Sequence, residues 1–176
     1  MREPLTADHL QAFMKALGKV AKTPSRIYLV GGASAVLLGW RPATIDVDLK
    51  IVPESDEVLR SIPELKELLH INVELASPDD FIPPLPGWED RSRFIQQEGK
   101  LSFYHYDFYA QALAKIERNM EIDRQDVAHL LDSGLVKRKK LGELFLAIED
   151  QIYRYPELNR ARFRSAVERI LKSSQD

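Results

Sequence analysis

The chain has 176 residues, with 25 Lys and Arg against 27 Asp and Glu, a formal net charge of −2 at pH 7, and no cysteine. A chain of this length buries roughly 70% of its unfolded surface, so its core needs no disulfide or metal to hold it together. The lack of cysteine excludes zinc–thiolate sites and thiol nucleophiles, and the near-neutral charge gives no support to broad nucleic-acid binding. No signal peptide or apolar run long enough to span a membrane stands out, so we expect a cytoplasmic protein without membrane contact.

The first predicted elements are a helix, a strand and a short second helix. Apolar residues at three- and four-residue spacing predict an amphipathic helix over 6–22. Ile27–Val30 is a short apolar run typical of a strand. Gly31-Gly32 ends this strand, and residues 33–38 predict one or two turns of helix that Gly39 closes.

The next predicted strand, 44–52, alternates between apolar and polar residues. Residues i and i+2 of a strand point the same way, about 6.6–7 Å apart, so Asp46 and Asp48 lie side by side on the polar face. Two carboxylates this close repel each other unless a cation lies between them, and Mg²⁺ is commonly held by one or two carboxylates plus substrate phosphates. The alternative interpretation is the solvated face of an edge strand.

The two glycines complement this carboxylate pair. Without a Cβ atom, the backbone of Gly31 and Gly32 can approach a phosphate closely, and the N–H groups that open the following helix point at an anion. The sequence therefore predicts a phosphate cradle and a metal-binding carboxylate pair on consecutive elements. A tight turn without chemistry is the alternative.

Two helix starts, at Ser55 and Ser61, and then a third strand over 71–76 are predicted after this stretch. The three prolines of 81–88 predict an ordered loop. This loop could hold a base or ribose against Trp88, although a packed connector is the more economical interpretation.

Residues 91–106 read as a hairpin with its turn at 98–100. His105, on its second arm, is either a phosphate donor or a structural histidine among aromatic residues. From Asp107 onward, apolar periodicity predicts four helices. We therefore divide the chain into an α/β core over 1–106 and a helical C-terminal subdomain over 107–176 that packs on the core.

The order of an apolar residue, Gly-Gly, a short helix and Asp-x-Asp on the next strand resembles the signature of the nucleotidyltransferase superfamily, which has the DNA polymerase β-like fold. The gap of 14 residues from Gly32 to Asp46 suits that signature. The whole chain is similar to an uncharacterised bacterial family of nucleotidyltransferase-like proteins, in strings such as NVELASPDDFIPPLPGW and FYHYDFYAQALAKIER. The resemblance implies an α/β (α+β) fold, in which helices flank a small mixed β-sheet and a helical part follows.

The resemblance also implies an activity, the transfer of an NMP group from a nucleoside triphosphate to an acceptor with release of pyrophosphate. The acceptor could be a small molecule, a tRNA or a protein. Asp46 and Asp48 would hold two Mg²⁺ ions, or Mn²⁺ in their place, about 3.5–4 Å apart. A third carboxylate on the next strand would complete this metal site and act as a base. Glu74 stands at the matching position, with Asp79 or Asp80, or no third carboxylate, as alternatives.

The nucleotide's phosphates would bind to two parts of the chain. Gly31, Gly32 and Ser34 would contact the β- and γ-phosphates, Ser34 through its hydroxyl, unless it is simply a small residue at a helix start. Lys115 matches a lysine that several branches of the superfamily place in a helix after the sheet, where it meets the triphosphate. The alternative for Lys115 is a solvated residue in an ion pair with a neighbouring Glu or Asp.

Those branches follow the lysine with an acidic helix of the form Arg-Asp-x-x-Asp. Asp123 and Asp126 match the two acids and are interpreted as helix-positioning or ion-pair residues, whereas Ile122 stands where the arginine belongs. This departure, with the open choice of third carboxylate, favours a second hypothesis: a catalytically inactive nucleotide- or partner-binding module, such as one half of a toxin–antitoxin pair with an antitoxin-type partner. The intact Asp46 and Asp48 favour an enzyme. A toxin that modifies tRNA or a protein is a third hypothesis.

Overall fold

The structure is a computed structural model that describes residues 3–173. The chain forms two compact units. One contains the chain up to Ser77 together with Ser92–Tyr106, and the other contains Pro78–Arg91 together with the chain from Asp107 onward. The segment Pro78–Arg91, which lies inside the predicted 1–106 domain, thus clusters with the helical unit.

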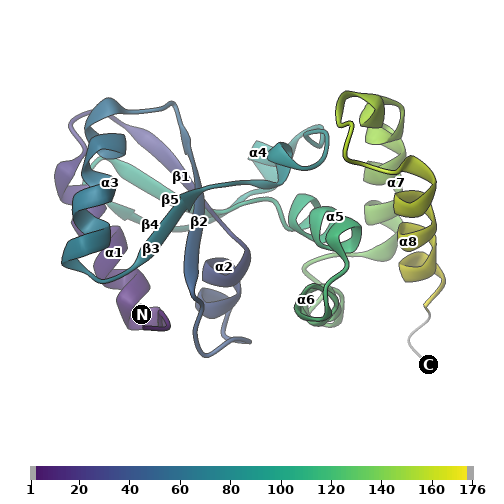
Figure 1. Cartoon of the computed structure of the whole chain (residues 1–176), viewed down its shortest axis with the longest axis horizontal. Coiled ribbons are helices and arrows are strands. Elements are labelled where there is room, and N and C mark those ends of the chain that lie inside the picture. Colours follow the sequence, from purple (N-terminus) through teal and green to yellow (C-terminus); the bar gives the residue numbers. More distant parts are fainter. Residues whose placement is uncertain (1–2, 174–176) are drawn as a thin grey trace. The chain divides into compact units, whose positions relative to one another are not determined.

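The first unit is an α/β assembly (Figure 1). Its elements are α1 (Ala7–Val20), β1 (Ser25–Val30), α2 (Gly31–Leu38), β2 (Asp46–Val52), α3 (Asp56–Leu68), β3 (Asn72–Leu75), β4 (Arg93–Glu98) and β5 (Leu101–His105). The strands form one five-stranded sheet in the order β3-β2-β1-β5-β4. β1 pairs antiparallel with β2 and parallel with β5, and β2 pairs parallel with β3. The predicted α/β class and mixed sheet are confirmed.

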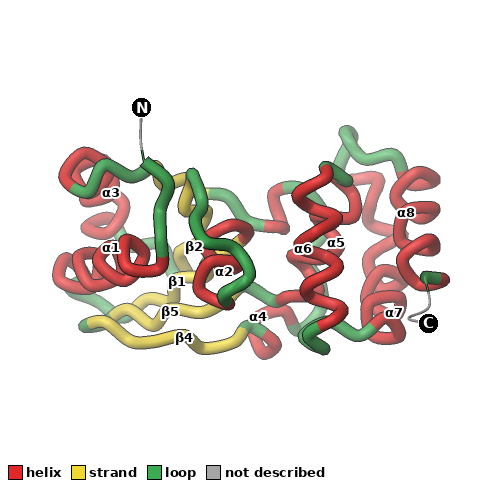
Figure 2. Tube along the Cα trace, turned by 90° about the horizontal axis from the view of Figure 1, so that it is seen from below, coloured by secondary structure: helices red, strands yellow, loops and turns green. Residues whose placement is uncertain are grey.

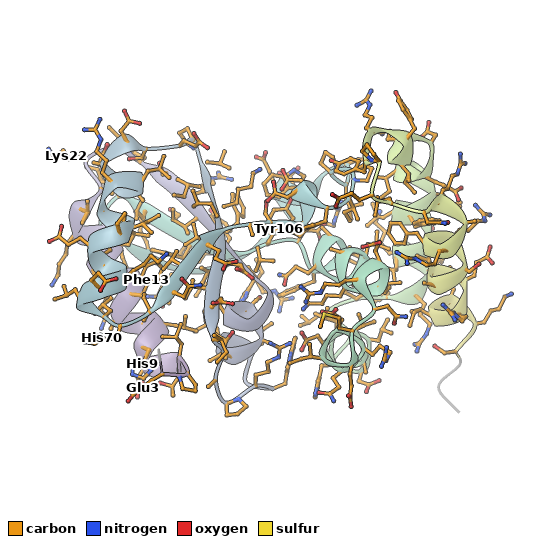
Figure 3. The ribbon with its side chains drawn as sticks, viewed as in Figure 1. Glu3, His9, Phe13, Lys22, His70 and Tyr106 are labelled. Atoms are coloured by element: carbon orange, nitrogen blue, oxygen red, sulfur yellow. The ribbon has the colours of Figure 1, made fainter. Side chains whose placement is uncertain are left out.

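Helices α1 and α3 cover one face of this sheet (Figure 2). The alternation predicted for β2 is confirmed, because its residues alternate strictly between buried and half-buried. The buried side chains of the strands meet those of the two helices in a single core, and Phe13 of α1 lies in the interior of the unit (Figure 3). The core includes Phe13, Leu17, Ile27, Leu29, Val47, Leu49, Val58, Ile62, Val73 and Phe103. The opposite face of the sheet carries the alternating side chains, which include Asp46 and Asp48 of β2 and the stacked rings of Tyr28 and Tyr104.

Helix α3 corrects one expectation. The sequence predicted a second helix start at Ser61, but α3 is continuous over Asp56–Leu68 with Pro63 inside it. Val58, Ile62 and Leu65 form one buried stripe at helical spacing. Burial of this stripe outweighs the hydrogen bond that the proline removes.

The second unit is helical. It contains the 3₁₀ turn η1 (Pro78–Asp80), α4 (Trp88–Arg91), α5 (Phe108–Arg118), α6 (Glu121–Asp132), α7 (Arg138–Ile148), the 3₁₀ helix η2 (Glu149–Arg154) and α8 (Arg160–Lys172). The predicted loop at 81–88 is present, and the four predicted helices correspond to α5 to α8. No helix of the described residues is long and apolar enough to cross a membrane.

The start of α5 is fixed by a buried ion pair. Asp107 is the N-cap and accepts a hydrogen bond from the backbone N–H of Tyr109 at 3.1 Å. Its Oδ2 also accepts from Nη2 and Nε of Arg91, at 2.7 and 3.2 Å. Since Asp107 is only 1% exposed, the two donors of Arg91 give this buried carboxylate a charged partner.

A close approach between α1 and the β4–β5 turn generates the first prediction. A Cβ atom at Gly18 would lie 2.5 Å from the backbone oxygen of Glu98. We expect Gly18→Ala to lower the free energy of unfolding by about 1–3 kcal/mol, because backbone on both sides must shift. Chemical denaturation of both proteins measures the loss.

Gly142→Ala is the matched control. Gly142 also lies inside a helix, but a Cβ there would meet only the end of the Leu171 side chain, at 3.0 Å. The side chain can move aside, and alanine gains about 1 kcal/mol of helix propensity, so we expect little change. Equal losses in the two variants would contradict the close approach.

Candidate functional site

Two neighbouring strands carry the predicted carboxylates on one face of the sheet. Asp46 and Asp48 lie on β2 and are both half-buried, on the face opposite the core. In the parallel pairing of β2 with β3, Glu74 is the register partner of Asp48 and Asn72 that of Asp46. Register partners on adjacent strands point to the same face about 5 Å apart. The fold thus brings Asp46, Asp48 and Glu74 onto one small polar surface.

Asn72 is a member of this surface that the sequence analysis did not single out. Its Nδ2 donates to Oδ1 of Asp46 at 2.7 Å and to Oε1 of Glu74 at 3.2 Å. The amide therefore lies between two carboxylates and offsets part of their repulsion. Asn72 lies two residues before Glu74 and therefore on the same face of β3. The alternation of this strand in the sequence was enough to predict that position.

The Gly31-Gly32 pair lies beside these carboxylates for two different reasons. Gly31 has φ +62°, in the left-handed region, and a Cβ there would lie 3.6 Å from Oδ2 of Asp48. A Cβ at Gly32 would overlap with the side chain of Thr44. The strand-to-helix turn between β1 and α2 therefore requires glycine at 31 for its backbone conformation and at 32 for its packing.

Thr44 is itself held in place. Its backbone exchanges hydrogen bonds with Leu5, with N–H···O distances of 2.6 and 2.9 Å, and its Oγ1 donates to the carbonyl of Asp46 at 3.2 Å. The N-terminal segment thereby positions both the start of α2 and the start of β2.

Ser34, the third predicted phosphate ligand, is only 2% exposed. Its Oγ lies 2.6 Å from Nδ1 of His105 on β5, and His105 is 6% exposed. Burial, with a further contribution from the positive charge of Arg93, lowers the pKa of His105 to about 4, so the ring is neutral at pH 7. The structural interpretation of His105 is supported, and the contact of Ser34 with a phosphate stays a prediction.

Lys115 belongs to the second unit, on α5. It is 9% exposed, and its Nζ lies 2.7 Å from Oδ2 of Asp126 and 3.8 Å from Oδ1 of Asp123. The ion pair that the sequence offered as an alternative is therefore present. Nucleotide binding by Lys115 stays a prediction.

Arg118 supplies the guanidinium that the sequence lacks at Ile122. Its Nε and Nη2 donate to the two oxygens of Asp123 at 2.7 and 2.6 Å. Burial alone would raise the pKa of Asp123, but the hydrogen bonds and charge of Arg118, the N–H of Met120 and the charge of Lys115 hold this pKa below its usual value. Ile122 is 45% exposed and takes no part in this network.

The structure thus gathers some predicted site residues and separates others. Asp46, Asp48, Glu74 and Gly31 share one region of the sheet unit, whereas Asp79 and Asp80 form a 3₁₀ turn of the helical unit. Within residues 3–173, no three His, Cys, Asp or Glu side chains converge as a group arranged to hold a metal. Glu74 is exposed, and its side chain is turned to Asn72.

Comparisons with known proteins agree on the kind of protein. The family model described as "Nucleotidyltransferase of unknown function (DUF6036)" matches residues 8–175. The crystal structure of an antigenic nucleotidyltransferase-like protein from Paracoccidioides brasiliensis is similar in fold, with a TM-score of 0.51, 14% sequence identity, and coverage of 94% of this chain and 95% of that one. A search of curated proteins gave no match.

The burial of His105, with a further contribution from the positive charge of Arg93, predicts an acid-sensitive step in stability. The folded-state pKa of His105, about 4, lies below the ordinary value of 6.5, so the unfolded chain binds the extra proton first. Stability from neutral His105 is complete above pH 6.5 and is lost as the pH falls to about 4, by a total on the order of 3 kcal/mol. Urea denaturation from pH 7 to pH 4 measures this loss.

His105→Gln should be less stable than the wild type at pH 7 but should lose less stability across that window. His129→Gln, at an exposed histidine of α6, is the control and should keep the wild-type slope. A His105→Gln protein with the same slope as the wild type would show that another group causes the acid sensitivity.

Proposed function

The chain belongs to a family of nucleotidyltransferases of unknown function, and from this premise we propose that it moves an NMP group from a nucleoside triphosphate to an acceptor in a metal-dependent reaction. The acceptor oxygen would attack the α-phosphorus, the bond to the β-phosphate oxygen would break, and pyrophosphate would leave. The acceptor would be a small molecule, a tRNA or a protein.

One observation carries this proposal. The paired carboxylates of Asp46 and Asp48 lie next to the first turn of α2, where Oδ2 of Asp48 is 3.6 Å from the position that a Cβ of residue 31 would take. The start of a helix favours anions, and the carboxylates favour cations. A site that offers both on one surface suits a magnesium–phosphate ligand better than either ion alone.

Mg²⁺ is commonly held by one or two carboxylates plus substrate phosphates, so the Asp46 and Asp48 pair suits this ion, although Glu74 does not converge with the pair. Asp46, Asp48 and Glu74 supply carboxylate oxygens from two paired strands. The Nδ2 of Asn72 donates to both Asp46 and Glu74, so it partly offsets their negative charge as a cation would. These carboxylates would hold the metal, which when bound would neutralise charge on the attacking and leaving oxygens.

The remaining roles fall to the chain's own groups. The N–H groups at Gly31 and Gly32 would bind the β- and γ-phosphates, and Ser34 would support that turn through its contact with His105. Glu74 is exposed and would accept the proton of the acceptor hydroxyl. Lys115 would offset charge on the leaving pyrophosphate.

A second candidate function is nucleotide or partner binding without catalysis. The observation that favours it is the engagement of Glu74 by Asn72 in place of convergence with Asp46 and Asp48. Such a module would bind the triphosphate or an antitoxin-type protein but would not transfer the NMP group.

The proposal predicts metal-dependent nucleotide binding. Calorimetric titration with ATP, GTP, CTP and UTP in the presence of Mg²⁺ should give tight binding of at least one triphosphate. Asp46→Ala/Asp48→Ala should weaken it at least about tenfold, the cost of losing a charge-assisted contact.

Asp79→Ala/Asp80→Ala is the matched control, because it removes two carboxylates from the rival position, and we expect it to bind as the wild type does. Transfer of label from the α-³²P-labelled triphosphate to small-molecule, RNA or protein fractions then identifies the acceptor. No binding of any triphosphate by the folded protein would sink the enzyme proposal, whereas binding without transfer would favour the inactive module.

Asn72 generates a further prediction. Because its amide now offsets the repulsion between Asp46 and Glu74, Asn72→Ala should leave that repulsion uncompensated and lower the melting temperature in EDTA. Added Mg²⁺ should then raise the melting temperature more in the variant than in the wild type, since the ion no longer displaces the amide. Thermal denaturation with EDTA and with Mg²⁺ measures both shifts.

Gln97→Ala, at an exposed amide of β4, serves as the control, with no change in its response to Mg²⁺. A smaller response to Mg²⁺ in Asn72→Ala than in the wild type would show that Asn72 itself is a metal ligand, against this account of its role.

A further inference from the structure

A groove in the helical unit carries an inference that is independent of the sheet. It has a volume of about 370 Å³ and is lined by residues of α5, α6 and α8. Helix α5 contacts both of the other two helices, and α6 lies next to it in Figure 1. The lining residues of the groove are Lys115, Ile116, Asn119, Arg124, Val127, Ala166, Arg169 and Ile170. The volume falls within the range of small-molecule sites, about 300–1,000 Å³.

The lining has an apolar floor and a cationic rim. Ile116 and Val127 are 5% and 3% exposed, and Ile170 is half-buried beside them. Arg124 and Arg169 are exposed, at the edges that α6 and α8 contribute. No carboxylate is among the lining residues, and the Lys115 charge is already matched by Asp126.

Arg124 and Arg169 both have N–H donors that could bind an anion. Nη1 of Arg124 donates to the backbone oxygen of Asn119 at 2.7 Å and to its Oδ1 at 3.4 Å, at the C-terminus of α5. In the part of the chain that the structure describes, no hydrogen bond or ion pair engages Nε or Nη2 of Arg124. No hydrogen bond or ion pair engages the guanidinium of Arg169 within residues 3–173. Two guanidinium groups thus border the same apolar floor.

The carboxylates of these three helices are largely committed to other partners. Glu117 pairs with Arg162, Asp123 with Arg118, Asp126 with Lys115 and Glu168 with Arg164. Internal ion pairs therefore leave the groove with an excess of positive charge. An external anion is the complement that the surface lacks.

We propose that this groove binds a small organic anion, whose phosphate or carboxylate group contacts Arg124 and Arg169 and whose apolar body lies on Ile116, Val127 and Ile170. Guanidinium groups bind such oxyanions through paired N–H donors. The groove uses none of the carboxylates or glycines of the proposed triphosphate site on the sheet. Lys115 lines the groove, but it is paired with Asp126 and is not one of the two anion contacts, so the groove's existence does not depend on nucleotidyl transfer.

Phenyl phosphate is a suitable probe, because it joins one phosphate to one apolar ring. Titration of the ¹⁵N-labelled full-length Asp46→Ala/Asp48→Ala protein in EDTA, followed by amide NMR spectra, excludes binding through a metal ion held by those carboxylates. We expect saturable shifts of amides on α5, α6 and α8. Inorganic phosphate, without the ring, and benzyl alcohol, without the charge, should each bind at least about tenfold more weakly.

Arg169→Gln and Arg124→Gln in the same background should each weaken phenyl phosphate binding about tenfold, the effect of one charge-assisted contact. Arg60→Gln is the matched control, since Arg60 is an exposed arginine of α3 in the other unit. Shifts away from the groove, equal binding of benzyl alcohol, or no effect of Arg169→Gln would overturn the proposal. Because Arg169 is exposed, its substitution should leave the fold intact, and a melting temperature checks this.

Discussion

The alternation of β2 is the constraint on which the candidate site depends. Val47 and Leu49 are 0% and 1% exposed and pack into the core with α1 and α3. Because successive side chains of a strand point to opposite faces, burial of these two residues forces Asp46 and Asp48 onto the other face. A shift of the β2 register by one residue would bury these two carboxylates, at a cost of several kcal/mol each. The hydrophobic core therefore holds the acidic pair in place.

Strand pairing also determines the position of the Gly31-Gly32 turn. In the antiparallel pairing of β1 with β2, Val30 is the register partner of Asp48, so Gly31 begins α2 directly beside that carboxylate. Gly32 packs on Thr44, which is hydrogen-bonded to Leu5. The turn that suits a phosphate is thus also the turn that this packing requires. The backbone conformation and the packing are sufficient reasons for the two glycines, and the proposed phosphate contact is compatible with both.

Local patterns in the sequence predicted most of the fold. The features that were missed depend on contacts between residues far apart in the sequence. The alternation of β2, the hairpin turn and the helical periodicity are all encoded within a few residues, and the structure confirms them. The Ser34–His105 contact joins residues 71 positions apart, and the position of Asn72 between Asp46 and Glu74 depends on strand register. Neither follows from one strand read alone. The continuity of α3 through Pro63 was missed because tertiary burial overrode a local signal.

In the helical unit, the free-energy cost of binding an anion differs between Lys115 and the two arginines of the groove. Lys115 is buried and paired with Asp126 at 2.7 Å, so any phosphate that captures its ammonium leaves Asp126 buried without that partner. Such a loss typically costs about 3–5 kcal/mol, which the phosphate must offset, unless it joins the pair without breaking it. Arg124 keeps part of its guanidinium fork unused, and Arg169 has no competing contact within residues 3–173. An anion that meets these arginines incurs no comparable penalty, because neither has to leave a buried carboxylate. The rim of the groove would therefore bind a negative charge at a lower cost than Lys115 would.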